Sequence, residues 1–326
     1  MDNNDFIRAQ KARKAFISTP NVTEILKHIE RCRNYSDRES EPSCMMVYGA
    51  SGVGKTSIIK KYLKNNPGDS TPTGDVLPVW YIELPENAKP VDAAREMLLA
   101  VNDPLALHET DIAILTHRII QLVKDLKVEL IIIDEFQHLV EKTSNKILAR
   151  VGDWLKMLIN KSKCPIILFG MPYSKVVLDA NSQLNGRFSI QFHLRPFSYL
   201  HERAIFEGFL KRLDEALPFN KRSGLDTALM QKKLYAFCQG NMRSLRNLIY
   251  HASVHAIENN EDCLTDGDFL YASELSSGDK SSTWKNPFKS SVTKDMLADP
   301  SNTIGWEDYF RNNRNRKVKI HSDLTI

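Results

Sequence analysis

The chain has 326 residues, of which 42% are hydrophobic and 26% are charged, a balance typical of one large or two ordinary globular domains. Its formal charge of +4 is too small for a uniformly basic surface, so any affinity for nucleic acid has to come from local patches. The five cysteines are scattered, without a C-x-x-C pair or zinc-spaced histidines, which argues against a disulfide framework or a zinc site. We find no signal peptide and no apolar run of membrane-spanning length, so we expect a cytoplasmic protein with no membrane partner.

Residues 1–40 are polar and are predicted to form an N-terminal extension with two helical pieces. Pro20 and Asn21 should separate the pieces, and Thr23 is a candidate N-cap for the second. From residue 41 to residue 196, short β-type runs alternate with helical patterns, which is typical of a parallel sheet covered by helices. The runs cover residues 44–48, 76–84, 130–134, 166–169 and 190–194.

The first run leads directly into a complete G-x-x-x-x-G-K-[ST] phosphate-binding loop followed by a helical pattern. Glycines let successive backbone N–H groups curl around phosphates, and the following helix adds the positive end of its dipole. The expected nucleotide-binding residues are Gly49, Ala50, Ser51, Gly52, Val53, Gly54, Lys55, Thr56 and Ser57. Lys55 should reach the β- and γ-phosphates of ATP, and Thr56 should bind Mg²⁺. A simple glycine-rich turn is the alternative.

The run 130–134 ends in two adjacent carboxylates, Asp134 and Glu135. We expect Asp134 to hold Mg²⁺ and Glu135 to polarise the water that attacks the γ-phosphate. Downstream, Lys142, Lys146 and Arg150 recur at four-residue spacing, and the last two would share one helix face. They are candidate DNA-phosphate contacts, although an ordinary solvated face is the equally reasonable alternative.

Two arginines are placed where an oligomeric ATPase needs them. Arg187 comes just before the last strand, from which it could reach a neighbour's γ-phosphate in trans, unless it is an ordinary surface arginine. Residues 197–277 read as successive helices, a small helical lid, and Arg243 lies at the start of one of them. Arg243 could contact phosphates from the same chain or form a salt bridge within the lid. Residues 278–326 are predicted to be a flexible tail, whose aromatic residues Trp284 and Phe288 are candidate anchors for a partner protein.

Together, the loop 49–56, the acidic strand end 130–135, an arginine before the last strand and Gly240–Arg243 opening a lid helix resemble the AAA+ ATPases. Within that class, Asp134-Glu-Phe-Gln-His-Leu139 and Phe16-Ile-Ser-Thr-Pro20 are similar to the TnsC/TniB group of transposition regulators, which includes members of CRISPR-associated transposons. The resemblance covers about residues 20–275.

The resemblance implies an α/β AAA+ P-loop NTPase fold with a helical lid, and an ATPase that uses ATP and Mg²⁺. It further implies a homo-oligomeric ring or filament on double-stranded DNA, in contact with a TniQ-type targeting protein and with transposase subunits, the latter through the tail. One feature departs from the pattern, because residues 166–172 offer no polar side chain at the end of the fourth strand of the sheet. Unless Ser174 or a neighbour substitutes, we expect slow hydrolysis.

Other AAA+ proteins, such as a helicase loader or an ExeA-like ATPase, and a nucleotide-dependent scaffold that does not hydrolyse ATP, remain alternatives. A small-molecule kinase would share the loop but not the acidic pair and the helical lid. A GTPase is disfavoured, since the nearest match to N-K-x-D is Asn160-Lys-Ser-Lys163, with lysine in place of the carboxylate.

Overall fold

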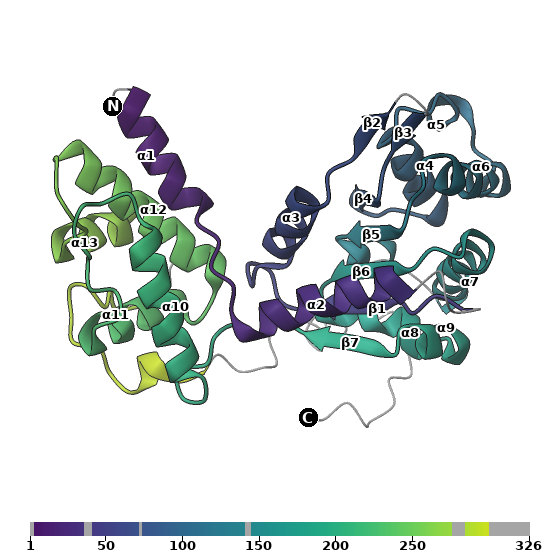
Figure 1. Ribbon diagram of the computed structural model, residues 1–326. Helices are drawn as coiled ribbons and strands as arrows, with labels where there is room; N and C mark the ends of the chain where they lie inside the picture. Colours follow the sequence, from purple (N-terminus) through teal and green to yellow (C-terminus); the bar gives the residue numbers. More distant parts are fainter. Residues whose placement is uncertain (1–2, 36–40, 72–73, 141–144, 276–283, 300–326) are drawn as a thin grey trace. The chain divides into compact units, whose positions relative to one another are not determined.

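The computed structural model describes residues 3–35, 41–71, 74–140, 145–275 and 284–299, which form two compact units (Figure 1). The α/β unit contains residues 21–51 and 55–194. The helical unit contains the described residues up to Pro20, the short stretch Gly52–Gly54 and the described residues from 195 to 299. The two helices of the predicted N-terminal extension therefore lie in different units.

Five parallel strands form the sheet of the α/β unit, in the order β4-β5-β6-β1-β7. They are β1 (Met45–Tyr48), β4 (Val79–Glu83), β5 (Leu130–Asp134), β6 (Ile166–Gly170) and β7 (Ile190–His193). Each of the five predicted strands is confirmed. Because β1 lies between β6 and β7, the loop that follows it leaves the carboxyl edge of the sheet beside the end of β6, where the amide of Gly49 donates to the Gly170 carbonyl at 3.1 Å.

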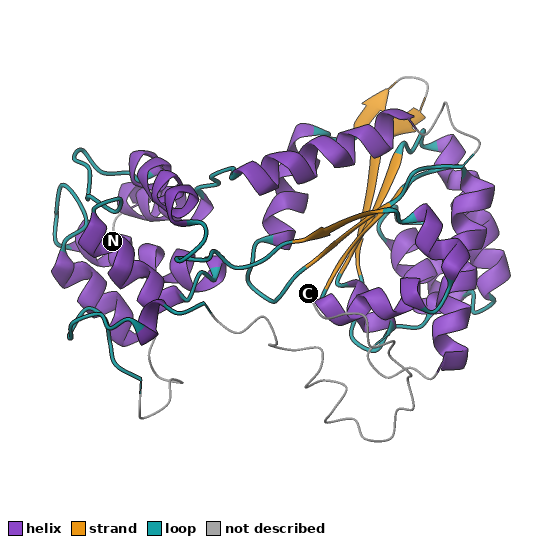
Figure 2. Ribbon diagram, turned by 90° about the horizontal axis from the view of Figure 1, so that it is seen from below, coloured by secondary structure: helices purple, strands orange, loops and turns teal. Residues whose placement is uncertain are grey.

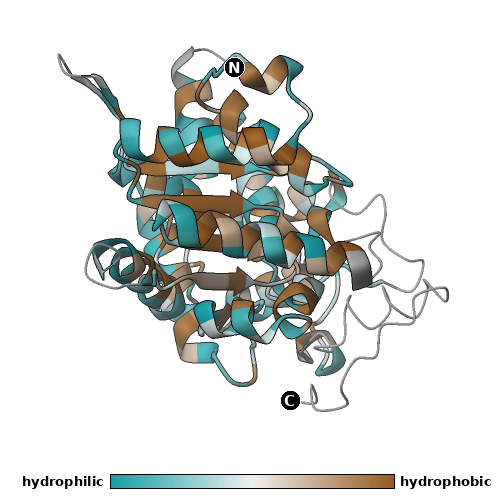
Figure 3. Ribbon diagram, turned by 90° about the vertical axis from the view of Figure 1, so that its right-hand side faces the viewer, coloured by the Kyte–Doolittle hydropathy of each residue, from teal (hydrophilic) through white to brown (hydrophobic). Residues whose placement is uncertain are grey.

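Both faces of this sheet are covered, as Figure 2 shows for the strands and the helices on either side of them. Alternate strand residues point to opposite faces, so Met46 and Ile131 enter the larger core cluster while Met45 and Ile132 are buried on the other side. Burial on both faces explains why β1, β5 and β6 read as continuous apolar runs. In Figure 3 they are brown, between helices that carry both apolar and polar residues.

One face packs against the helices that follow β4, β5 and β6 in the chain. These are α4 (Pro90–Leu99), α5 (Leu105–His108), α6 (Ile112–Asp125), α7 (Asn145–Ser162), α8 (Val176–Asp179) and α9 (Ser182–Arg187). The other face carries α2 (Pro20–Tyr35) and α3 (Lys55–Asn65). The ring of His28 in α2 lies 5.2 Å from that of Phe192 in β7, and the Tyr62 hydroxyl of α3 donates to Glu30 of α2 at 2.7 Å.

The start of α2 differs from the prediction. The helix begins at Pro20 itself, so Thr23 lies inside it and is not its N-cap. Proline is favoured at the first helical position, because its missing N–H would have no partner there and its φ is already helical. The sequence analysis also did not predict a hairpin of β2 (Asp69–Thr71) and β3 (Gly74–Val76). Each strand has only three residues, mostly polar, which is too short to show the apolar–polar alternation that indicates a strand.

The helical unit contains the helices predicted for the lid. They are α10 (Arg203–Ala216), α11 (Ala228–Cys238), α12 (Met242–Glu258) and α13 (Asp266–Leu275), and α1 (Asn3–Lys14) packs along α12. Ala12 enters their common core, and the Arg13 guanidinium lies 5.1 Å from the centre of the Tyr250 ring. In the part of the chain that the structure describes, no helix is long and apolar enough to cross a membrane.

Residues 284–299, the described part of the predicted tail, pack against the helical unit and include the 3₁₀ turn η3 (Asp295–Leu297). The Phe288 ring stacks on Phe269 at 5.5 Å, and Trp284 meets Phe237 edge-on at 6.0 Å. The carboxylate of Asp299 accepts hydrogen bonds from two hydroxyls of the unit, at 2.6 and 3.0 Å. Trp284 and Phe288 are therefore packed within the helical unit rather than presented as anchors for a partner, while residues 300–326 lie outside the described residues.

Candidate functional site

The phosphate loop joins the end of β1 to the start of α3, as its spacing predicts. Gly52 and Gly54 have φ values of +81° and +110°, a region that side chains disfavour and that only glycine enters freely. The Lys55 ammonium donates to the carbonyls of Gly49 at 2.6 Å and Ala50 at 3.0 Å, so the side chain curls back over its own loop. Lys55 is also the first residue of an eleven-residue helix. A buried cation beside a helix N-terminus suits an anionic group such as a phosphate.

Asp134 at the end of β5 lies beside the first turn of that helix. The Thr56 hydroxyl donates to Asp134 Oδ2 at 3.2 Å, and the amide of Glu135 donates to Oδ1 at 2.9 Å. The Asp134 side chain is fully buried, and burial raises its pKa from 3.8 to about 6, although these two hydrogen bonds and Lys55 act in the opposite direction. Burial therefore penalises the charged carboxylate.

Thr56 and Asp134 present the hydroxyl and carboxylate oxygens that Mg²⁺ prefers. Among the described residues, no group of three or more histidine, cysteine, aspartate or glutamate side chains could hold a metal ion. A magnesium ion usually takes only one or two protein ligands and fills its shell with water and nucleotide phosphates, so this pair fits such an ion. A cation here would also relieve the cost of burying the Asp134 charge.

Glu135 sits in a strained conformation next to Asp134. Its φ of 54° and ψ of 37° lie in the left-handed region, which is uncommon for residues other than glycine and clusters at functional sites. The 3₁₀ turn η1 (Phe136–Leu139) follows, and from it the Gln137 side-chain amide donates to the Glu135 carboxylate. Gln137 Oε1 accepts from the amide of Met171, just beyond β6, at 3.1 Å. The sequence analysis did not single out Gln137.

The end of β6 carries no polar side chain, because the strand finishes at Gly170. Ser174, the predicted substitute, is fully buried nearby in η2 (Pro172–Lys175), but its hydroxyl donates to the Met171 carbonyl. A Cβ on Gly170 would lie 2.5 Å from the Ser174 Oγ and 3.3 Å from the Gln137 Oε1. Gln137, and not Ser174, is therefore the side chain that joins the ends of β5 and β6.

Arg187 lies at the amino edge of the sheet, away from the loop of its own chain. Its carbonyl accepts from the amide of Cys44, which precedes β1, at 3.1 Å. Its guanidinium bonds to Glu41 at 3.1 Å and to Asn160. Since β1 has four residues, the two edges are roughly 13 Å apart. At this position the Arg187 guanidinium is paired with Glu41 and Asn160 and lies away from the phosphate loop of its own chain.

Arg243 belongs to the helical unit, where it is the second residue of α12. The Asn241 side chain caps this helix by accepting from the amides of Arg243 at 3.0 Å and Ser244 at 3.2 Å. The pKa of Arg246, one turn further on, is lowered by burial and by the neighbouring charges of Arg13 and Arg243. Arg243 is thus part of a positive cluster formed by α1 and α12.

The predicted DNA contacts lie on or before α7. Arg150 is exposed on this helix. Lys146 is in the first turn of α7, although the structure does not describe its side chain. Lys142 lies outside the described residues. The four-residue spacing of Lys146 and Arg150 places both on one face of α7.

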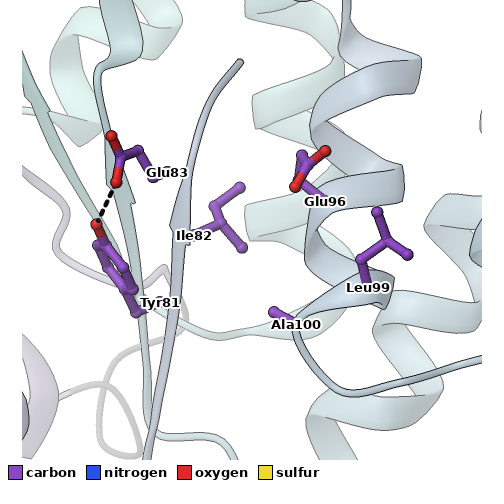
Figure 4. A pocket seen from close by; sticks show the side chains of 6 residues that line it. All are labelled: Tyr81, Ile82, Glu83, Glu96, Leu99 and Ala100. Atoms are coloured by element: carbon purple, nitrogen blue, oxygen red, sulfur yellow. Dashed lines mark hydrogen bonds between the residues drawn. The ribbon is translucent and has the colours of Figure 1, made fainter.

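A separate hollow of about 410 Å³ lies between the edge strand β4 and α4 (Figure 4). It is lined by Tyr81, Ile82, Glu83, Glu96, Leu99 and Ala100, with the Tyr81 hydroxyl donating to Glu83 at 3.4 Å. No residue of the phosphate loop lines it. The hollow is therefore not the predicted nucleotide site.

Several solved structures share the fold. The ORC2 protein of Aeropyrum pernix, in ADPNP-ADP complexes, has a TM-score of 0.56 at 14% identity, and the match covers 84% of this chain and 73% of that one. ORC1 of the same organism, in complex with DNA, has a TM-score of 0.57 at 16% identity, covering 80% and 66% of the two chains. Cdc6p of Pyrobaculum aerophilum has a TM-score of 0.56 at 13% identity, covering 84% and 71%. At these identities the likeness establishes the fold alone, which is the predicted AAA+ fold.

In sequence, no curated protein matches the chain. The model of a family described as bacterial TniB protein matches residues 7–199, more than half of the chain. The match spans the phosphate loop, the acidic end of β5 and Arg187. The chain therefore belongs to the bacterial TniB protein family.

Proposed function

We propose that this protein is an ATP-dependent regulator of DNA transposition, which assembles on double-stranded DNA in the ATP state and links a TniQ-type targeting protein to the transposase. The proposal rests on the observation that this TniB-family chain brings Lys55, Thr56 and Asp134 together at the carboxyl edge of the sheet. Membership of the TniB family favours transposition over the other AAA+ roles, the helicase loader and the ExeA-like ATPase.

The residues around the loop suit ATP hydrolysis. Backbone amides of the loop and Lys55 would hold the phosphates, and Thr56 and Asp134 would hold Mg²⁺. The ion would supply charge neutralisation on the phosphate oxygens. Glu135 would accept a proton from the attacking water, since its carboxylate follows directly after the metal-holding carboxylate.

Arg187 would couple ATP hydrolysis to assembly of the oligomer. A guanidinium that lies away from its own loop can act on the nucleotide of a neighbouring copy, where such a residue increases the rate by several powers of ten. The contacts with Glu41 and Asn160 would then be exchanged for phosphate oxygens. Arg243 would bind phosphate from the same chain and report nucleotide state to the helical unit. Because nucleotide held between copies stabilises their interface, ATP favours the oligomer.

Duplex DNA would meet the oligomer through α7. Lys146 and Arg150, with Lys142 just before the helix, would contact phosphates without reading sequence. Each such contact should steepen the dependence of binding on salt by about 0.9 in the log–log slope. Replacing Arg150 by Ala is therefore expected to reduce that slope, whereas replacing an exposed lysine on α3, such as Lys64, should leave it unchanged.

The first test compares DNA binding and particle images with ATP, a non-hydrolysable analogue, ADP and no nucleotide. We expect rings or filaments on duplex DNA only with a triphosphate, and none with the Lys55→Ala variant. Monomers that ignore DNA under every condition would refute the proposal. A pull-down with TniQ-type and transposase proteins then tests the transposition role itself.

Mixing variants tests the contact in trans. Arg187→Ala retains its phosphate loop, and Lys55→Ala retains Arg187, so a mixed interface would combine both intact parts. We expect each variant alone to be inactive and the mixture to regain ATP hydrolysis. A mixture of Lys55→Ala with Glu135→Gln serves as the control, because every interface then lacks the loop lysine or the catalytic carboxylate. No recovery in the first mixture would contradict a role for Arg187 in trans.

A scaffold that binds ATP without hydrolysing it is the second candidate, favoured by the lack of a polar side chain at the end of β6. Glu135→Gln separates the two. A hydrolysing switch should remain trapped on DNA in this variant, whereas a scaffold should dissociate at the wild-type rate.

A further inference from the structure

We propose that Gln137 is the positioning residue that aims the Glu135 carboxylate during ATP hydrolysis, by tying the end of β5 to the end of β6. The inference rests on the ATPase activity proposed above. It concerns a residue two positions beyond the acidic pair whose side chain is 4% exposed and which contacts both neighbouring strand ends.

The orientation of the Gln137 amide follows from its partners. The Met171 N–H can only donate, so the oxygen of the amide must face it, at 3.1 Å. This leaves the NH₂ group to face Glu135, whose ionised carboxylate can only accept. The Gln137 amide therefore donates to Glu135 and accepts from Met171 at the same time. A hydrogen bond to an ionised group is among the stronger ones in a protein, so this contact can hold the carboxylate against thermal motion.

The backbone gives the Glu135 side chain a specific direction that the amide then fixes. The left-handed conformation of Glu135 turns the chain sharply after β5, and its amide is tied to Asp134 Oδ1. Phe136 and Leu139 in η1 are fully buried, which anchors the turn that carries Gln137. Strained residues persist where the surroundings determine their conformation, and here the surroundings include the Gln137 amide.

The end of β6 is shaped to admit this amide. Gly170 has no side chain, and a Cβ there would press on the Gln137 Oε1 at 3.3 Å and on the Ser174 Oγ at 2.5 Å. The end of β6 has no polar side chain of its own, and Gly170 leaves space there for the Gln137 side chain from η1. Because β6 pairs with β1, the amide ties the carboxylate to the strand next to the one that leads into the phosphate loop.

The test uses two variants of nearly the same size in the full-length protein. Gln137→Glu keeps an acceptor for the Met171 amide but places a second carboxylate against Glu135, and Gln137→Met loses both contacts. We expect the single-turnover rate of ATP hydrolysis with Mg²⁺ to fall about 10- to 100-fold in both, the range expected when a catalytic group is misplaced by about 1 Å. The affinity for a fluorescent ATP analogue should change less than about threefold, since the Gln137 side chain hydrogen-bonds to Glu135 and Met171 and not to the phosphate loop.

A double-mutant cycle separates positioning from a general structural role. If Gln137 acts only through Glu135, then adding Gln137→Glu to Glu135→Ala should not lower the residual rate further. An equal fall in both backgrounds would overturn the inference, because a structural defect does not depend on the carboxylate. Gln137→Glu hydrolysing ATP at the wild-type rate would also overturn it. A wild-type rate no higher than that of Glu135→Ala would instead refute the proposed ATPase, and the inference with it.

Discussion

Replacing Asp134 by Asn should stabilise the α/β unit at neutral pH while abolishing Mg²⁺-dependent hydrolysis. The Asp134 carboxylate is fully buried, and burial raises its pKa from 3.8 to about 6. Asparagine has nearly the same shape and can still accept from the Glu135 amide, while the Thr56 hydroxyl can turn to accept from its NH₂ group. The substitution therefore removes the buried charge and little else.

The size of the effect follows from the raised pKa. The native state binds the Asp134 proton more tightly than the unfolded chain does, so the carboxylate costs stability above pH 6 and costs nothing below pH 4. A shift of about two units at about 1.4 kcal/mol each corresponds to roughly 3 kcal/mol. We expect Asp134→Asn to gain about 2–3 kcal/mol at pH 8, with the gain declining between pH 6 and pH 4.

Urea titrations at pH 8, 6 and 4 without nucleotide or Mg²⁺ test this reasoning. Trp80 and Trp154 are buried in the α/β unit, so tryptophan fluorescence reports its unfolding when Trp284 and Trp306 are replaced by phenylalanine in all variants. Asp153→Asn is the control, because Asp153 is exposed on α7 and paired with Lys156 at 2.8 Å, an arrangement worth well under 1 kcal/mol. A gain for Asp134→Asn that is equal at pH 4 and pH 8, or a loss at pH 8, would refute the argument from burial.

Four further predictions concern the helical unit. Gly240→Ala should destabilise it by more than about 2 kcal/mol, because φ is +72° and the new Cβ would lie 2.1 Å from the Phe197 carbonyl oxygen. Gly208→Ala in α10 meets nothing within 4 Å and should instead stabilise by about 0.5–1 kcal/mol, so thermal melts with the same shift for both would contradict us. Asp214→Ala should cost about 3–5 kcal/mol by circular dichroism, since this buried carboxylate accepts from three backbone amides in the loop after α10, and a cost below 1 kcal/mol would refute that account. Asp299→Ala should release residues 284–299, and limited proteolysis should then cut there faster than in wild type, with unchanged cutting contradicting the role of this carboxylate.

The fold could be predicted because its signals are local. Five β-type runs, each four or five residues long in the structure, alternate with helical patterns, and a parallel sheet covered by helices leaves that alternation in the sequence. That Lys55, Thr56 and Asp134 lie close together could also be predicted from the sequence. A loop that follows β1 and an acid that ends β5 must meet at the carboxyl edge of a parallel sheet.

The sequence by itself thus determined the α/β class, the lid helices and the composition of the phosphate-binding edge, since these follow from local patterns and from the common edge at which parallel strands end. Only the tertiary structure decided that Gln137 bridges Glu135 and Met171, that Arg187 lies at the opposite edge, and that Trp284 packs on the helical unit. Those contacts join residues that are far apart in sequence or on different strands. Their partners are selected by packing and by the need to satisfy buried polar groups, which no periodicity in the sequence records.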